Sequence, residues 1–214
     1  MAVIAPCVLA ETPEAYKEMI ERVQPFAKRI HIDLADGEFA PTNTVIGDDI
    51  WLPQDVLVDI HAMVAHPEKH VQYLAALKPH LIIFHAELPI NMPALLQYVK
   101  QCGIKAGVAL QRSTVPASVK ETLEMADHCM IFSGDLGHYG GKASLMQLEK
   151  VRLIKAINSG LEIGWDGGVN VENAYSLAQN GVDVLNVGGA IQKADDPQAV
   201  YTALVNEINK HGVL

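Results

Sequence analysis

The stretch RIHIDLADGEFAP, residues 29–41, opens with the alternating pattern of a β-strand. Three aliphatic residues alternate with His31 and Asp33, so the two ionisable side chains share one face of the strand. Burying an ionisable group without a partner is costly. A strand with an imidazole and a carboxylate two residues apart therefore indicates either a satisfied hydrogen-bond network or a functional site.

The strand pattern recurs along the chain, and helix-like segments separate its copies. Strands are predicted at VIAPCVLA (3–10), RIHIDLAD (29–36), LVDIHAMV (57–64), LIIFHAEL (81–88), IKAGVAL (104–110), CMIFSG (129–134), LEIGWDGG (161–168) and VDVLNVGG (182–189). Helices, with apolar residues three or four apart, are predicted at residues 13–24, 67–77, 92–102, 115–126, 145–159, 171–180 and 197–211.

Strands separated by helices form parallel βαβ units. Eight such units in 214 residues predict a (β/α)8 TIM barrel that occupies residues 1–214 as a single domain. The competing arrangement is a doubly wound open sheet, which we disfavour because no GxGxxG motif follows the first strand.

The composition restricts the function. A formal net charge of −9 argues against a general binder of nucleic acid or of anionic membranes. No apolar run reaches the roughly 18 residues that a membrane span needs, and the N-terminus does not resemble a signal peptide. Cys7, Cys102 and Cys129 show no disulfide or metal-knuckle spacing. We therefore expect a cytoplasmic protein.

Polar pairs occupy the ends of the predicted strands, where TIM barrels place their active sites. The strand at residues 29–36 has His31 and Asp33 two residues apart, and the strand at residues 57–64 has Asp59 and His61 in the same relation. The strand at residues 161–168 contributes Asp166. The set His31, Asp33, His61 and Asp166 offers two imidazoles and two carboxylates, which suits one divalent ion such as Zn²⁺, Mn²⁺, Fe²⁺ or Co²⁺. The alternative is a hydrogen-bond network that closes the barrel mouth, but four such residues on three strands favour a site.

The remaining histidines and acids near these strands have less specific patterns. Asp59 and Glu87 are expected to orient the imidazoles through hydrogen bonds, and His85 could either bind the metal or orient another ligand. His128 lies near the end of an element and is expected to be solvated. Asp36, followed by a glycine, is expected to shape the loop and not to bind metal.

Glycine-rich stretches follow the last three strands, where barrels often bind phosphate through backbone N–H groups. The alternative is that these glycines only make tight turns. The candidate phosphate-binding residues are Gly140, Gly141, Lys142, Gly167, Gly168, Gly188 and Gly189.

These motifs together resemble the ribulose-phosphate 3-epimerase family over nearly the whole chain. HIDLADGEFAP is similar to the family's H-x-D-x-x-D-G-x-F-x-P, and DIHAMV is similar to D-x-H-L-M-V. FHAE and the segment from DGGVN to NVGGAI continue the resemblance in order.

The resemblance implies a metal-dependent isomerase of a ketose phosphate that works through a cis-enediolate. Asp33 and Asp166 would be acid and base on opposite faces of carbon 3, while His31 and His61 would only bind the metal. Cys7 and Met63 would contact the substrate. The resemblance also implies a small phosphorylated sugar as partner and a homo-oligomer.

The chain departs from the family pattern around the sugar. Cys7 replaces a serine, Ala35 a methionine and Ala62 a leucine, so we expect a roomier pocket that admits a longer ketose phosphate. The family's N-P-G-F-G-G-Q reads here as DLGHYGGK, which places Gly137 and His138 where proline and glycine are expected and Lys142 where glutamine is expected; Gly189 also stands for a serine.

Two other functions remain as alternatives. Decarboxylases and aldol-type synthases on related barrels use a D-x-K motif on the third strand, where this chain has DIH. A non-catalytic sugar-phosphate-binding protein would not need two opposed aspartates.

Overall fold

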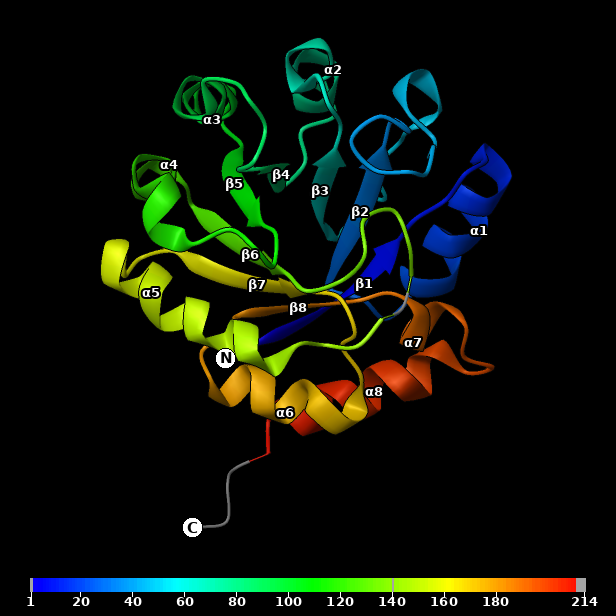
Figure 1. Ribbon diagram of the computed structural model, residues 1–214. Helices are drawn as coiled ribbons and strands as arrows, with labels where there is room; N and C mark the ends of the chain where they lie inside the picture. Colours follow the sequence, from blue (N-terminus) through cyan, green and yellow to red (C-terminus); the bar gives the residue numbers. More distant parts are fainter. Residues whose placement is uncertain (1, 140, 211–214) are drawn as a thin grey trace.

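A computed structural model describes residues 2–139 and 141–210 and shows a closed barrel of parallel strands (Figure 1). Neighbouring strands in the chain are neighbours in the barrel, and β8 closes it by pairing with β1. The strands are β1 (Val3–Val8), β2 (Arg29–Ala35), β3 (Leu57–Met63), β4 (Leu81–His85), β5 (Lys105–Leu110), β6 (His128–Phe132), β7 (Glu162–Asp166) and β8 (Val184–Val187). The predicted TIM barrel is confirmed.

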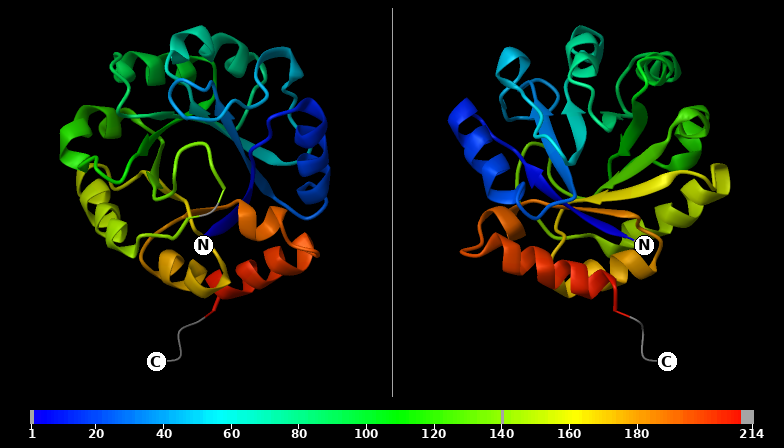
Figure 2. Two further views of the ribbon diagram at one scale, coloured as in Figure 1. Left: turned by 45° about the vertical axis from the view of Figure 1, so that its right-hand side comes forward. Right: turned by 180° about the vertical axis from the view of Figure 1, so that it is seen from behind.

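Helices ring the outside of the barrel, as both views of Figure 2 show. They are α1 (Pro13–Val23), α2 (Val71–Ala76), α3 (Met92–Gln101), α4 (Lys120–Met125), α5 (Glu149–Ile157), α6 (Val171–Gln179), α7 (Gly189–Gln192) and α8 (Pro197–Ile208). Within residues 2–139 and 141–210, none of them combines the length and apolar character needed to cross a membrane.

Side-chain caps explain where several helices begin. The side chains of Thr12, Asn91 and Asp196 each accept a hydrogen bond from a backbone N–H in the first turn, which satisfies a donor that the helix leaves free. Asn170 and Asn173 form a reciprocal capping box at the start of α6.

The predicted helices differ from the observed ones mainly at their starts. Short 3-10 turns at residues 67–69, 116–119 and 145–148 precede α2, α4 and α5, where unbroken helices were expected. No segment was predicted for α7, which follows the glycines at the end of β8. The last predicted helix ends at Ile208, and the predicted end at residue 211 lies outside the described residues.

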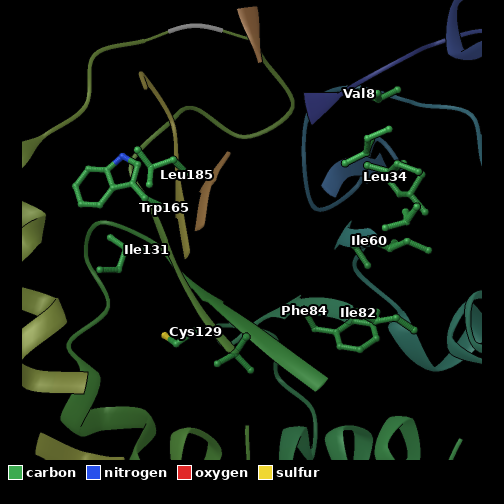
Figure 3. Close-up of a cluster of buried hydrophobic side chains, with 14 of the residues drawn as sticks. Val8, Leu34, Ile60, Ile82, Phe84, Cys129, Ile131, Trp165 and Leu185 are labelled. Carbon is green, nitrogen blue, oxygen red and sulfur yellow. The ribbon is translucent and has the colours of Figure 1, made fainter. Parts of the chain in front are cut away.

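The outward faces of the strands form the main hydrophobic core against the helices. Figure 3 shows this layer, whose labelled side chains come from most of the strands around the barrel. Ile60, Phe84 and Trp165 are among its fully buried members. Removing this apolar surface from water stabilises the ring of helices on the barrel.

The inward faces of the strands form layers of different character. A small apolar layer of Leu81, Ile83, Ala109, Met130 and Phe132, from β4, β5 and β6, fills one side of the barrel interior. Charged and polar side chains lie at both ends of the strands. The barrel interior is therefore a packed core with an ionic base and a polar mouth.

An ion cluster closes the base of the barrel, at the amino ends of the strands. Arg29 donates from Nε to Asp59 Oδ2 at 2.6 Å and from both terminal nitrogens to Glu162 at 2.9 and 2.8 Å. His128 Nδ1 lies 2.8 Å from Glu162 Oε2. A Cβ at Gly164 would lie 2.5 Å from His128 Nε2, so this glycine leaves room for the imidazole.

Glu162→Gln should destabilise the protein at neutral pH and make its free energy of unfolding less dependent on pH in the acidic range. Burial raises the pKa of Glu162, but His128 and Arg29 outweigh it and hold the pKa well below its usual value. Its stabilising effect is therefore full above the ordinary glutamate pKa of about 4.3 and declines as the pH falls below it. We expect a loss of about 1 to 3 kcal/mol at neutral pH.

Denaturant unfolding at neutral and at acidic pH measures this difference. Glu11→Gln, at an exposed position, is the control and should change little at either pH. A variant as stable as the parent at neutral pH would contradict a stabilising role of the Glu162 charge.

Candidate active site

Four ionisable side chains meet inside the mouth of the barrel. His31 and Asp33 come from β2, His61 from β3 and Asp166 from the end of β7. Asp33 and His61 are register partners on adjacent strands, and their Oδ1 and Nδ1 atoms lie 2.8 Å apart. His31 Nε2 lies 3.3 Å from Asp33 Oδ1 and 3.9 Å from Asp166 Oδ2.

The cluster fits a divalent metal ion. One potential ligand atom from each of the four residues lies within 4.8 Å of every other. His31 is completely buried, and neither of its ring nitrogens makes a hydrogen bond of good geometry among the described residues, although Nε2 lies 3.3 Å from Asp33 Oδ1. A buried imidazole with poorly formed hydrogen bonds is costly, and coordination of an ion would compensate for that cost. Two nitrogens and two carboxylate oxygens suit a first-row metal.

A chain of hydrogen bonds orients His61 from its Nε2 side, away from Asp33. His61 Nε2 lies 2.9 Å from His85 Nε2, and His85 Nδ1 lies 3.3 Å from Glu87 Oε2. Glu87 accepts further hydrogen bonds from Thr114 and from the backbone N–H of Gln111. When His61 donates from Nε2 to His85 and His85 donates from Nδ1 to Glu87, His61 Nδ1 keeps a lone pair, beside Asp33, that can bind an ion.

Two sequence-based assignments near the cluster are wrong. Asp59 does not support an imidazole of the mouth, because it pairs with Arg29 at the base. His128 is buried in that same cluster, not solvated. Both belong to inward-facing positions at the amino ends of their strands, where a charged residue needs a partner inside the barrel.

Asp36 holds the loop after β2, as predicted. Its Oδ1 accepts hydrogen bonds from the backbone N–H groups of Glu38 and Phe39, both at 3.0 Å. Its Oδ2 accepts one from Ala65 at 2.7 Å. All three contacts are to backbone, which fits a structural carboxylate.

The two aspartates of the cluster have opposite pKa shifts. Burial raises the pKa of Asp33, but the adjacent His31 and His61 outweigh it and hold the pKa far below its usual value. Burial and the neighbouring Asp33 carboxylate raise the pKa of Asp166 to about 7. Burial lowers the pKa of His61 to about 4, so its ring is neutral, the form that binds metals. The site thus pairs an ionised carboxylate with one that exchanges its proton near neutral pH.

A cavity above the cluster includes most of the predicted contact residues. Both aspartates line it, together with Cys7, Met63, Gly167, Gly168, Gly188 and Gly189. Gly141 and Lys142 are exposed and are not among its lining residues in the described part of the chain. The predicted contact at Gly140 lies outside the described residues.

Two lining residues were absent from the sequence-based set, Tyr139 and Asn186. Asn186 is buried in β8, and its Oδ1 has no hydrogen-bond partner among the described residues. An amide between outward-facing Leu185 and Val187 is a signal that the alternation in β8 could have supplied. Tyr139 comes from a loop, where no periodicity indicates a direction.

The glycines after β7 also have a packing role. Gly167 and Gly168 both adopt positive φ. A Cβ at Gly167 would lie 2.1 Å from the backbone nitrogen of Gly134, and one at Gly168 would lie 2.2 Å from that of Ala143. The loop after β6 therefore approaches this turn so closely that only glycine fits.

The expected roomier pocket is not seen at the two alanines. Ala35 does not appear among the residues that line the cavity. The side chains of Phe39 and Leu136, from the loops after β2 and β6, pack against the cluster that contains Ala35 and Met63. Ala62 faces outward and belongs to the main core. The space beside Ala35 is therefore occupied by side chains from the loops after β2 and β6.

The fold and the cluster together define a class, the (β/α)8 barrels with a candidate metal centre at the carboxyl ends of the strands. Comparison with known proteins narrows this class. The chain belongs to the Ribulose-phosphate 3 epimerase family, whose model matches residues 3–192. The resemblance noted in the sequence is confirmed.

Curated relatives carry the same family name. The chain is 32% identical over 210 residues to the ribulose-phosphate 3-epimerase of Helicobacter pylori (strain ATCC 700392 / 26695), with 95% of this chain and 96% of that protein covered. It is 30% identical over 207 residues to that of Aquifex aeolicus, with 93% of each covered. These relatives are isomerases by name.

Solved structures support the fold. The 3-hexulose-6-phosphate synthase of Salmonella typhimurium matches with a TM-score of 0.73 over 98% of this chain and 100% of that chain, at 18% identity. At this identity the similarity concerns the barrel and not the reaction.

Proposed function

We propose that this chain is a metal-dependent epimerase that inverts carbon 3 of a ketose phosphate. The observation that carries the proposal is the pair of aspartates in the cluster, with ligand oxygens within 4.8 Å of each other and pKa values shifted in opposite directions. Groups with separated pKa values in one cavity are suited to act as acid and base.

The two aspartates would exchange protons with opposite faces of the sugar. Removing the hydrogen beside the ketone gives a cis-enediolate, and inversion requires the other carboxyl group to deliver a proton from the opposite face. Asp33 and Asp166 come from β2 and β7, so their side chains enter the mouth from different sides of the barrel. A divalent ion held by His31, Asp33, His61 and Asp166 would supply Lewis-acid stabilisation of the developing oxyanion.

The phosphate of the substrate would lie on the glycine side of the cavity. Gly167, Gly168, Gly188 and Gly189 line it after β7 and β8. Backbone N–H groups can hold an anion there even though the protein is acidic overall. As part of the same proposal we expect a cytoplasmic homo-oligomer that takes a small phosphorylated sugar as its partner.

The decarboxylase or synthase alternative receives no support from the site. His61 occupies the position of the lysine in the D-x-K motif, and its Nδ1 points to Asp33. Asp59, the first residue of that motif, pairs with Arg29 instead of facing the cavity. A binding protein without catalysis would not require the opposed pKa shifts of the aspartates.

Solvent-deuterium exchange tests the proposed function. We expect one deuteron to enter carbon 3 of a ketose 5- or 6-phosphate in D2O, with inversion, and a chelator to stop the exchange. A panel of pentulose and hexulose phosphates would identify the preferred sugar. Release of carbon dioxide or of an aldehyde, without exchange at carbon 3, would overturn the proposal in favour of a related barrel enzyme.

A further inference from the structure

The loop after β6 covers the mouth of the barrel. We call residues 133–139 and 141–144 the mouth cover; in the left view of Figure 2 this yellow-green loop crosses the opening. Its base is closed by a hydrogen bond of 2.8 Å from the backbone N–H of Ser144 to Ser133 Oγ. Close contact with Gly167 and Gly168 fixes the cover at both of its ends. Compact loops with joined ends can move as units.

Two contacts hold the cover to neighbouring loops only weakly. Arg112 pairs with Asp135 at 2.7 Å, but both side chains are more than half exposed, so the pair contributes little. Thr42 Oγ1 donates to the carbonyl of Gly137 at 2.7 Å, which is a single hydrogen bond between neutral groups. Neither contact reaches the side of the mouth formed by β1 and β8.

Tyr139 makes the contact that reaches across the mouth. Its hydroxyl accepts a hydrogen bond from the backbone N–H of Leu9 at 2.5 Å and donates one to the carbonyl of Cys7 at 3.1 Å. A Cβ at Gly188 would lie 2.5 Å from the tyrosine ring, so the ring packs directly on this glycine. Tyr139 also lines the cavity, while the adjacent His138 is exposed.

We propose that Tyr139 is a positioning residue that latches the mouth cover to β1 through its hydroxyl, so that a phosphorylated ligand enters and leaves only when this latch opens. Both hydrogen bonds are made by the hydroxyl, so the latch depends on this one group of the side chain. The ring lies beside Gly188, one of the candidate phosphate contacts, which couples opening of the cover to access to that side of the cavity.

Tyr139→Phe tests the latch, because it keeps the ring and removes only the hydroxyl. Lys142 is exposed in the cover, so trypsin cleavage after it reports opening without any assay of activity. Loss of the partner of the part-buried Leu9 N–H should shift the equilibrium toward the open state and speed this cleavage about tenfold. Under the proposed function, KM for the ketose phosphate should rise about tenfold while kcat changes less than about twofold.

Matched variants separate the latch from general destabilisation. Tyr98→Phe, on α3 and away from the mouth, should leave the cleavage and KM unchanged. Thr42→Val removes a weaker contact of the cover and should speed cleavage less than about threefold. Unchanged cleavage after Lys142 in Tyr139→Phe, or an equal increase at all tryptic sites, would overturn the latch. If no ketose phosphate were turned over, only the proposed function would fail, since the cleavage comparison does not use activity.

Discussion

Asp166→Asn should reduce epimerisation by about a hundredfold to ten-thousandfold, the range attributed to a positioned acid or base. The amide cannot take up the proton that burial and Asp33 keep exchangeable near neutral pH in the parent. Because the two aspartates would serve opposite faces of carbon 3, the loss should be asymmetric. We expect solvent-deuterium exchange to disappear from one epimer of the substrate and to survive from the other, where Asp33 removes the proton.

Asparagine keeps a carbonyl oxygen that can still bind an ion, so metal content should be measured on the same sample. Asp49→Asn, at an exposed position in the loop after β2, is the matched control and should exchange both epimers at the parental rate. Normal turnover by Asp166→Asn would contradict the mechanism with two carboxylates. Loss of exchange from both epimers with the metal retained would contradict the assignment of one aspartate to each face.

His61→Ala should lower the affinity for a divalent ion by at least about a hundredfold, since removal of a group behind a ligand already costs about ten- to a hundredfold. The substitution removes a proposed ligand and also the partner of Asp33 and His85. We expect the purified variant to lose most of the roughly one ion per chain that the parent should carry. Metal analysis after dialysis against a weak chelator would measure the loss.

A graded series makes this result interpretable. Glu87→Gln leaves the four proposed ligands intact and changes only the end of the hydrogen-bond chain through His85. It should therefore weaken metal binding about ten- to a hundredfold, less than His61→Ala. His66→Ala, at an exposed histidine, should bind the ion as the parent does. Equal metal content in all the variants would argue against the cluster as the metal site.

Alternation along the strands was sufficient to predict the barrel and the convergence of the four side chains. In a parallel barrel, residues at the carboxyl ends of strands with the same parity must face one mouth, so His31, His61 and Asp166 could be grouped before any coordinates were known. The same parity rule did not distinguish the mouth from the base. Asp59 faces inward like His61, but it lies two residues nearer the amino end of β3 and pairs with Arg29.

The contacts that loops make could not be predicted from the sequence. Leu136 packs against the cluster that contains Ala35, and Tyr139 reaches β1 across the mouth. Both are set by the path of one loop and have no periodic pattern that would indicate a direction. For Gly167 and Gly168 the sequence offered phosphate binding or a tight turn, but not their packing role, because the close approach of another backbone segment is a long-range contact that local turn rules do not contain.

The apolar layer inside the barrel has a consequence for how the protein could change. Ile83 and Met130 belong to this layer, and no hydrogen bond among the described residues joins the Arg29 cluster at the base to the His61 cluster at the mouth, although Asp59 and His31 are register partners on adjacent strands. Substitutions at sites without shared partners usually have additive effects on stability. Directed evolution could therefore alter substrate choice at the mouth while the ion pairs at the base continue to stabilise the barrel.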